Sequence, residues 1–154
     1  MSFKSDLGYG ENIENQWIKY LEGNGMYHKV FKVEGNFEHF DVIAVTKQGE
    51  IDTYEIKSDR RWMDTGNTVL EIGTKNDDSG VLASKATYLV NYLEGDAFYF
   101  TTIDEIRKFY IKDTECRTVK GGDGFRQILL IIPVPKMNKL FTKVTDFDKF
   151  TNNK

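Results

Sequence analysis

The chain has 154 residues, of which 40% are hydrophobic and 14% aromatic, and its formal net charge is −3 at pH 7. This length and composition suit one compact domain with a hydrophobic core, expected to span residues 1–154. The slight negative charge argues weakly against nucleic-acid binding, because proteins of that class usually carry a basic surface. It does not exclude the class, since local charge decides contact with phosphate.

Composition also disfavours several other classes of protein. Cys116 is the only cysteine, so an internal disulfide is impossible, as is typical of a reducing cytosol. His28 and His39 are the only histidines, and no Cys/His cluster indicates a zinc site. No apolar run reaches membrane-spanning length, and the first residues lack the apolar core of a signal peptide. We therefore expect a cytoplasmic protein without membrane association.

The first predicted element is a helix over residues 10–21. At about 100° per residue, Ile13, Trp17 and Leu21 fall on one apolar stripe. Glu14 projects within this apolar face, where a carboxylate needs a partner. Two interpretations remain open for Glu14. Its stem packs while its head reaches water, or its carboxylate points at the same metal ion as acidic residues further along the chain.

Several strands are predicted next. Residues 27–34 form one strand, with a turn at 35–36, and the stretch 37–59 contains two more strands joined by a turn at 47–50. A loop at 58–67 leads to a strand at 68–73. Glu71 in this last strand is either a carboxylate behind a metal site or part of an exposed strand face.

The stretch 37–59 carries the most informative residues. Because side chains alternate between the faces of a strand, Asp41 shares a face with Phe37, His39, Ile43 and Val45. Glu55 and Lys57 share a face of the next strand. A carboxylate among apolar neighbours is costly to bury unless something pairs with it. Two carboxylates and an ammonium on a half-buried sheet therefore suggest a divalent metal site with a lysine beside it.

This stretch resembles the core of the PD-(D/E)XK nuclease superfamily, the restriction-endonuclease-like fold. The matching residues are Asp41 on one strand and Glu55-Ile56-Lys57 on the next, with Phe40 in the place of the family's proline. Glu55-Ile56-Lys57 is the only acid-x-Lys triplet in the chain. The spacing of Gly10 and Glu14 also looks like the start of archaeal Holliday-junction resolvases and small phage nucleases. The resemblance covers a core of about residues 10–112 and leaves 113–154 as a C-terminal extension.

The resemblance implies an α/β fold with a central mixed β-sheet flanked by helices. It also implies a nuclease that hydrolyses DNA with Mg²⁺, or with Mn²⁺ in its place. Asp41, Glu55, Glu14 and the Ile56 backbone carbonyl would hold the metal ion, since Mg²⁺ prefers oxygen ligands. Lys57 would orient the attacking water or stabilise the transition state. In-line attack would leave a 5′-phosphate and a 3′-hydroxyl, in DNA recombination, repair or phage-encoded degradation of a host genome.

Further basic residues are candidates for DNA contact. Arg60 and Arg61 lie just past the Lys57 end of the strand, where a phosphate contact and a solvated loop are equally plausible. Lys85 lies beside aromatic positions of a predicted helix. It either contacts DNA or packs its stem there and extends its amine to solvent. Holliday-junction resolvases are dimers, so a homodimer is also implied, although no sequence patch marks an interface.

The rest of the chain predicts alternating helices and strands. The apolar spacing predicts the main helix over residues 79–94, with Ser79 as its N-cap. A short strand over 96–100 precedes a capping box, Thr102 to Glu105, that opens a helix ending near Ile111. Beyond it we expect a glycine-rich loop at 121–124, an apolar strand at 128–132 and a loosely packed tail over 138–154.

Two other functions are compatible with the same residues. The chain is either a catalytically inactive nuclease fold that binds nucleic acid or a protein partner, or an α/β domain whose charged strand residues only form salt bridges. The intact Asp41, Glu55 and Lys57 set argues against the first alternative, whereas the net acidity argues weakly for it.

Overall fold

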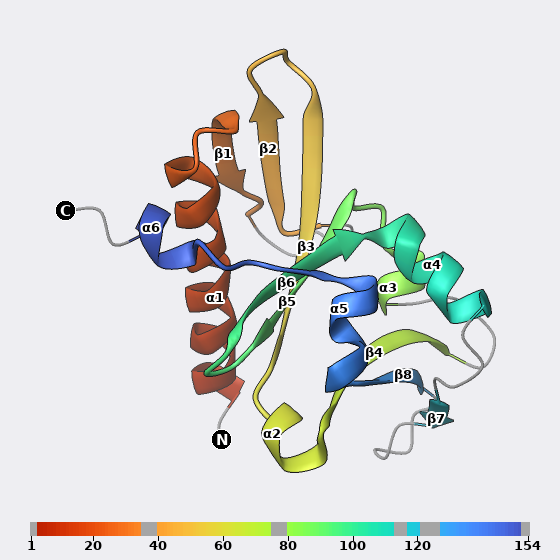
Figure 1. The fold of residues 1–154 in the computed structure, drawn as a ribbon. Coiled ribbons are helices and arrows are strands. Elements are labelled where there is room, and N and C mark those ends of the chain that lie inside the picture. Colours follow the sequence, from red (N-terminus) through yellow and green to blue (C-terminus); the bar gives the residue numbers. More distant parts are fainter. Residues whose placement is uncertain (1–2, 35–39, 75–79, 113–116, 121–126, 152–154) are drawn as a thin grey trace.

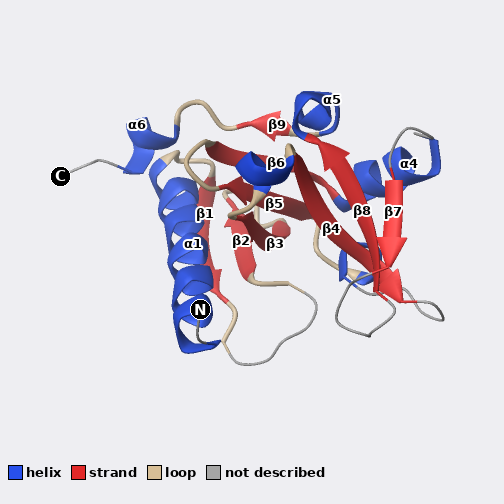
Figure 2. Ribbon diagram, turned by 90° about the horizontal axis from the view of Figure 1, so that it is seen from below, coloured by secondary structure: helices blue, strands red, loops and turns tan. Residues whose placement is uncertain are grey.

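The computed structural model describes residues 3–34, 40–74, 80–112, 117–120 and 127–151, and Figure 1 draws the others as a thin grey trace. The chain forms a six-stranded sheet with strand order β1-β2-β3-β5-β6-β9 and a three-stranded sheet with order β4-β8-β7. Only β3 and β5 pair in parallel within the large sheet, which is therefore mixed. Helices flank this sheet, so the predicted α/β class is confirmed (Figures 1 and 2).

The bounds of the elements are as follows. The large sheet contains β1 (Tyr27–Lys32), β2 (Val42–Thr46), β3 (Ile51–Asp59), β5 (Tyr88–Leu93), β6 (Ala97–Thr102) and β9 (Thr142–Lys143). The small sheet contains β4 (Asn67–Thr74), β7 (Arg117–Lys120) and β8 (Gln127–Pro133). The helices are α1 (Phe3–Gly23), α2 (Trp62–Thr65), α3 (Gly80–Ala83), α4 (Ile103–Lys112), α5 (Met137–Leu140) and α6 (Phe147–Thr151), with a 3-10 turn at Val134–Lys136. Among the described helices, none combines the length and apolarity that a bilayer crossing requires.

Helix α1 covers one face of the large sheet with the stripe that the sequence predicts. It begins earlier than expected, at Phe3, and ends at Gly23. Ile13, Trp17 and Leu21 are almost fully buried against strands of the sheet. The Trp17 ring lies 5.3 Å from the ring of Phe98 on β6, centroid to centroid. Burial of this stripe fixes which strand residues face α1 and which face the other side of the sheet.

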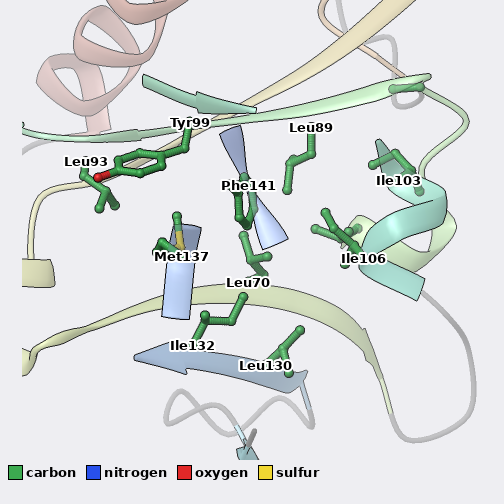
Figure 3. Packing of buried hydrophobic residues seen from close by; sticks show 12 residues of the cluster. Leu70, Leu89, Leu93, Tyr99, Ile103, Ile106, Leu130, Ile132, Met137 and Phe141 are labelled. Carbon is green, nitrogen blue, oxygen red and sulfur yellow. The ribbon is translucent and has the colours of Figure 1, made fainter. Parts of the chain in front are cut away.

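A second core fills the space between the two sheets. Figure 3 shows Leu70, Leu130 and Ile132 of the small sheet pointing toward β5 and β6 of the large sheet. Leu89 and Leu93 of β5 meet them and are fully buried. The small sheet therefore covers the face of β5 and β6 that lies opposite α1.

The predicted helix over 79–94 is wrong in most of its length. Helix α3 ends at Ala83, and β5 occupies the residues from Tyr88 to Leu93. Ser84 ends the helix in a turn, because its Oγ accepts a hydrogen bond from the Ala86 N–H at 3.1 Å. The strand is buried on both faces, so its sequence does not alternate and matches a helical stripe by coincidence. Consequently Lys85 lies in an exposed loop and not on a helix.

The C-terminal tail packs closely, contrary to the loose packing expected for residues 138–154. Phe141 and Val144 are buried, in the inter-sheet core and the α1 core respectively. β9 pairs with β6 as an edge strand, and α6 packs against α1. Apolar positions spaced irregularly across short elements follow neither a helical nor a strand period, so the sequence pattern did not reveal this packing.

Smaller differences concern element boundaries. β2 begins at Val42, so Asp41 directly precedes the strand and does not lie within it. Part of the predicted loop at 58–67 belongs to β3, and another part forms α2. The strand at β6 is confirmed, and so is the cap of Thr102 on the next helix, since the Glu105 N–H donates to Thr102 Oγ1 at 3.1 Å. Several predictions lie outside the described residues: the turn at 35–36, Phe37, His39, Ser79, Cys116 and the loop at 121–124.

The close packing of the tail leads to a stability prediction. Phe141→Ala is expected to lower the free energy of unfolding by about 3–5 kcal/mol, because it removes a buried ring and leaves a cavity. Thr145→Ala, at an exposed position of the same tail, is the control and should change it little. Urea unfolding followed by circular dichroism measures both values. Equally small decreases in the free energy of unfolding for the two variants would contradict the close packing of Phe141.

Candidate active site

Strand β3 places Glu55 and Lys57 on the face of the sheet opposite α1. Glu55 is in register with Leu89 of β5, and Lys57 with Asn91. Leu89 belongs to the inter-sheet core, so the odd-numbered side chains of β3 point the same way. Tyr54 and Ile56 pack on the α1 side. The predicted division of this strand into two faces therefore agrees with the structure.

Asp41 reaches the middle of β3 from the start of β2. Its backbone N–H donates to the Tyr54 carbonyl at 2.8 Å. Its side-chain Oδ2 accepts a hydrogen bond from the Ile56 N–H, also at 2.8 Å. The register of β2 and β3 runs only from the Val42–Tyr54 pair toward the hairpin turn. Beyond the end of this backbone pairing, the side chain of Asp41 bonds to β3 in place of a backbone carbonyl. The carboxylate is thus fixed beside the Glu55-Ile56-Lys57 triplet.

Glu55 is a buried carboxylate with little compensation. Only 8% of the residue is exposed, and its Oε2 atom is buried without a hydrogen-bond partner among the described residues. Burial raises the pKa of Glu55 to about 7; Lys57 opposes this shift, whereas the charges of Asp41 and Glu71 add to it. Carboxylates that remain buried without a partner usually serve a function, because they destabilise the fold.

Glu14 lies near the same cluster but has a partner of its own. Its Oε1 atom lies 3.6 Å from the Lys32 Nζ on β1, and its side chain is 23% exposed. Burial and the nearby charge of Asp41 raise the pKa of Glu14, while Lys32 opposes the rise. The charge of Asp41 therefore acts on both Glu14 and Glu55.

The acidic residues do not form a ready-made three-ligand cluster. Within the described part of the chain, no group of three or more Asp, Glu, His or Cys side chains is close enough to hold a metal ion. Two carboxylates suffice for Mg²⁺, which usually keeps several water ligands. Asp41 and Glu55 fit such an ion, because the unpartnered Oε2 of Glu55 offers a hard oxygen donor. Metal binding by all four predicted groups, the side chains of Asp41, Glu55 and Glu14 and the Ile56 carbonyl, stays a prediction.

The three basic residues predicted to contact DNA lie in two places. Arg60 and Arg61 directly follow β3, and both line a pocket of about 460 Å³ at this end of the strand. The Arg60 guanidinium stacks on the ring of Tyr9 from α1, 3.6 Å from its centroid. Lys85 is exposed just before β5. Because β3 and β5 are parallel, Lys85 lies near the opposite end of β3 from the two arginines.

A hydrogen-bond chain beside Lys57 escaped the sequence analysis. Asn91 Nδ2 donates to Thr68 Oγ1 at 2.9 Å, and the Thr68 hydroxyl donates to Asp59 Oδ2 at 2.9 Å. Thr68 and Asn91 are fully buried. These hydrogen bonds tie β4 of the small sheet to β3 and β5. No sequence signal pointed to Asn91, since it was assigned to a helix.

Comparisons with known proteins add two similar folds. The sequence matches no protein-family model and no curated protein. Among solved structures, the fold is similar to Hjc, a Holliday junction resolvase from the archaeal hyperthermophile Archaeoglobus fulgidus. The TM-score is 0.49 at 12% sequence identity, over 95% of this chain and 98% of that chain. A bacterial homing endonuclease gives a TM-score of 0.44 at 19% identity, over 62% and 67% of the two chains. The function proposed below rests on this chain's own residues.

The buried Glu55 leads to a prediction on pH and stability. Because its folded-state pKa is about 7 instead of 4.5, the folded protein binds the extra proton between these values, and stability falls as pH rises through them. Without metal, the free energy of unfolding of Glu55→Gln should therefore rise relative to that of wild type as the pH increases from about 5 to about 8. The total relative rise is up to about 3 kcal/mol. Urea unfolding in EDTA measures this. Glu50→Gln, in an exposed turn, should show no such trend, and a flat difference for Glu55→Gln would contradict the prediction.

Proposed function

We propose that this protein is a deoxyribonuclease that hydrolyses DNA phosphodiester bonds with the help of a divalent metal ion. The observation that carries the proposal is the buried Glu55 carboxylate, with an unpartnered oxygen, next to Asp41 and within the field of Lys57. Two like charges in a poorly solvated site repel each other, and a proton on one of them or a cation near both offsets the repulsion. A cation that binds there is also placed to bind a phosphate.

The chemistry of a divalent metal ion determines what it would contribute to hydrolysis. Asp41 and Glu55 would hold Mg²⁺, or Mn²⁺ in its place, and the ion would neutralise phosphate charge and lower the pKa of a bound water. The Ile56 carbonyl would complete the protein ligands, and Glu14 would bind directly or through water. Asp41 is already oriented for this role, because its hydrogen bond from the Ile56 N–H fixes one carboxylate oxygen and leaves the group rigid.

Lys57 supplies the positive charge on the solvent side of the site. Its side chain is exposed and lies on the same strand face as Glu55, two residues further on. An ammonium group at this position orients an attacking water or stabilises the negative charge of the transition state. The backbone that carries Lys57 is held on both sides, because β3 lies between β2 and β5.

Cleavage by wild type and a lysine variant tests the catalytic part of the proposal. Lys57→Ala is expected to cut plasmid, single-stranded or branched DNA at least about a hundredfold more slowly than wild type in Mg²⁺ or Mn²⁺. Lys47→Ala, in the β2–β3 turn, changes the net charge equally and should cut at the wild-type rate. Equal rates for wild type and Lys57→Ala on all three substrates would overturn the assignment.

Metal binding is tested separately by thermal unfolding. Mg²⁺ should raise the unfolding temperature of wild type, because a ligand that binds only the folded state stabilises it. Asp41→Asn and Glu55→Gln should lose this response, whereas Glu50→Gln should keep it. A response in wild type that both site variants retain would place the ion elsewhere.

A second candidate function is a nuclease fold that binds nucleic acid or a protein without cutting. The observation in its favour is that Glu14 pairs with Lys32 and that the described acidic residues form no cluster of three. Isothermal titration calorimetry separates the two functions, because a pure binding module has no need to bind Mg²⁺. Binding of DNA without Mg²⁺ binding or cleavage would favour this alternative.

A further inference from the structure

The pocket at the C-terminal end of β3 is the strongest unassigned feature of the molecule. It has a volume of about 460 Å³ and is lined by Ser58, Asp59, Arg60, Arg61, Thr65, Asn67 and Val69. Two arginines face a single carboxylate in this lining. Asp59 is already engaged, since its Oδ1 accepts the Arg61 N–H at 2.8 Å and its Oδ2 accepts the Thr68 hydroxyl. More basic than acidic side chains therefore line the pocket.

The two arginines are held by different contacts. Arg60 lies over the Tyr9 ring, with the guanidinium carbon 3.6 Å from the ring centroid, so α1 keeps it beside the pocket. The Arg61 backbone is fixed at both ends, by the bond from its N–H to Asp59 and by bonds to its carbonyl from the first turn of α2. Within the described part of the chain, the Arg61 guanidinium makes no hydrogen bond or ion pair, and the residue is exposed.

The small helix that carries Arg61 is itself anchored. The Trp62 Nε1–H donates to the Glu94 carbonyl at 2.8 Å, which ties α2 to the turn between β5 and β6. Gly66 ends the helix with a positive φ of 74°, a conformation that other residues rarely adopt. A cation on such a rigid support loses less conformational freedom on binding a ligand than one on a flexible loop.

The position of the pocket relative to Glu55 suggests its ligand. β3 rises about 3.3 Å per residue, so Asp59 lies about 13 Å from Glu55 along the same strand face. This separation exceeds the size of one phosphate group, so a single phosphate cannot occupy both places. A DNA strand with one phosphate at the carboxylate pair has another within reach of the pocket.

We propose that this pocket binds a backbone phosphate of DNA a few nucleotides from the cleaved bond. Arg61 makes the contact, and Arg60, which Tyr9 holds in place, adds a second positive charge near the phosphate. The inference rests on the proposed function for its ligand, because the same DNA molecule occupies both places. It also accounts for how a chain with a net charge of −3 holds a polyanion next to two carboxylates.

The salt dependence of DNA binding tests the proposal without any cleavage. Fluorescence anisotropy of a labelled duplex is measured in EDTA over a range of monovalent salt. Loss of one phosphate contact reduces the slope of log K against log salt by about 0.9 and weakens binding about eightfold near 0.1 M salt. We expect this result for Arg61→Ala. Lys47→Ala, about 30 Å away at the other end of β3, is the charge-matched control and should show neither change.

The outcomes separate this proposal from the nuclease proposal. If Arg61→Ala and Lys47→Ala have the same affinity and slope, the pocket is not a phosphate site, even if the wild-type protein cuts DNA. If wild type cuts no DNA but its binding depends on Arg61 as expected, the phosphate site stands and the nuclease assignment fails. Because Arg61 is exposed, its replacement leaves the core intact, which circular dichroism checks.

The role of Tyr9 has its own pair of variants. Tyr9→Phe keeps the ring under Arg60 and should bind DNA as wild type does. Tyr9→Ala removes the ring and should weaken binding as much as Arg60→Ala, without a further loss when both substitutions are combined. Additive losses would show that Tyr9 acts independently of Arg60 and would overturn the positioning role.

Discussion

The burial of the Glu55 carboxylate beside Asp41 is the constraint on which the rest of the site depends. Burial alone raises the pKa of Glu55, and the neighbouring negative charge raises it further. A fold tolerates such a group when another gain offsets the cost, and in the proposed function that gain is the binding of a metal ion. The hydrogen bond from the Ile56 N–H holds the Asp41 carboxylate beside the strand that carries Glu55.

The two sheets explain why this carboxylate is buried while Lys57 is exposed. The small sheet covers β5, where Leu89 and Leu93 are fully buried, but it does not reach the start of β3, where Ile51 is 64% exposed. Glu55 lies at the boundary between the covered and the open part of the same face. The hydrogen-bond chain from Asn91 through Thr68 to Asp59 fixes this boundary, because it joins β4 to the two central strands.

Charge is distributed unevenly along β3. Acidic groups gather at the middle of the strand, whereas two arginines follow its C-terminal end and line a pocket there. The overall charge of −3 therefore describes neither end of the strand. A polyanionic ligand meets a local positive charge at the arginines, and a cation meets a local negative charge at the carboxylates. Both arrangements are carried by one strand, so a change in its register would disturb them together.

The sequence by itself determined the elements whose side chains follow a clear period or a local hydrogen-bond rule. These include the apolar stripe of α1, the two faces of β3 and the Thr102 cap of α4, because each depends on residues close together in the chain. It also indicated Asp41, Glu55 and Lys57 as one group. Only the tertiary structure decided that β5 is a strand, since burial on both faces removes the alternation that would reveal it. The contact of Asp41 with the Ile56 N–H, the stacking of Arg60 on Tyr9 and the packing of the tail likewise join segments far apart in the chain, and no local pattern encodes them.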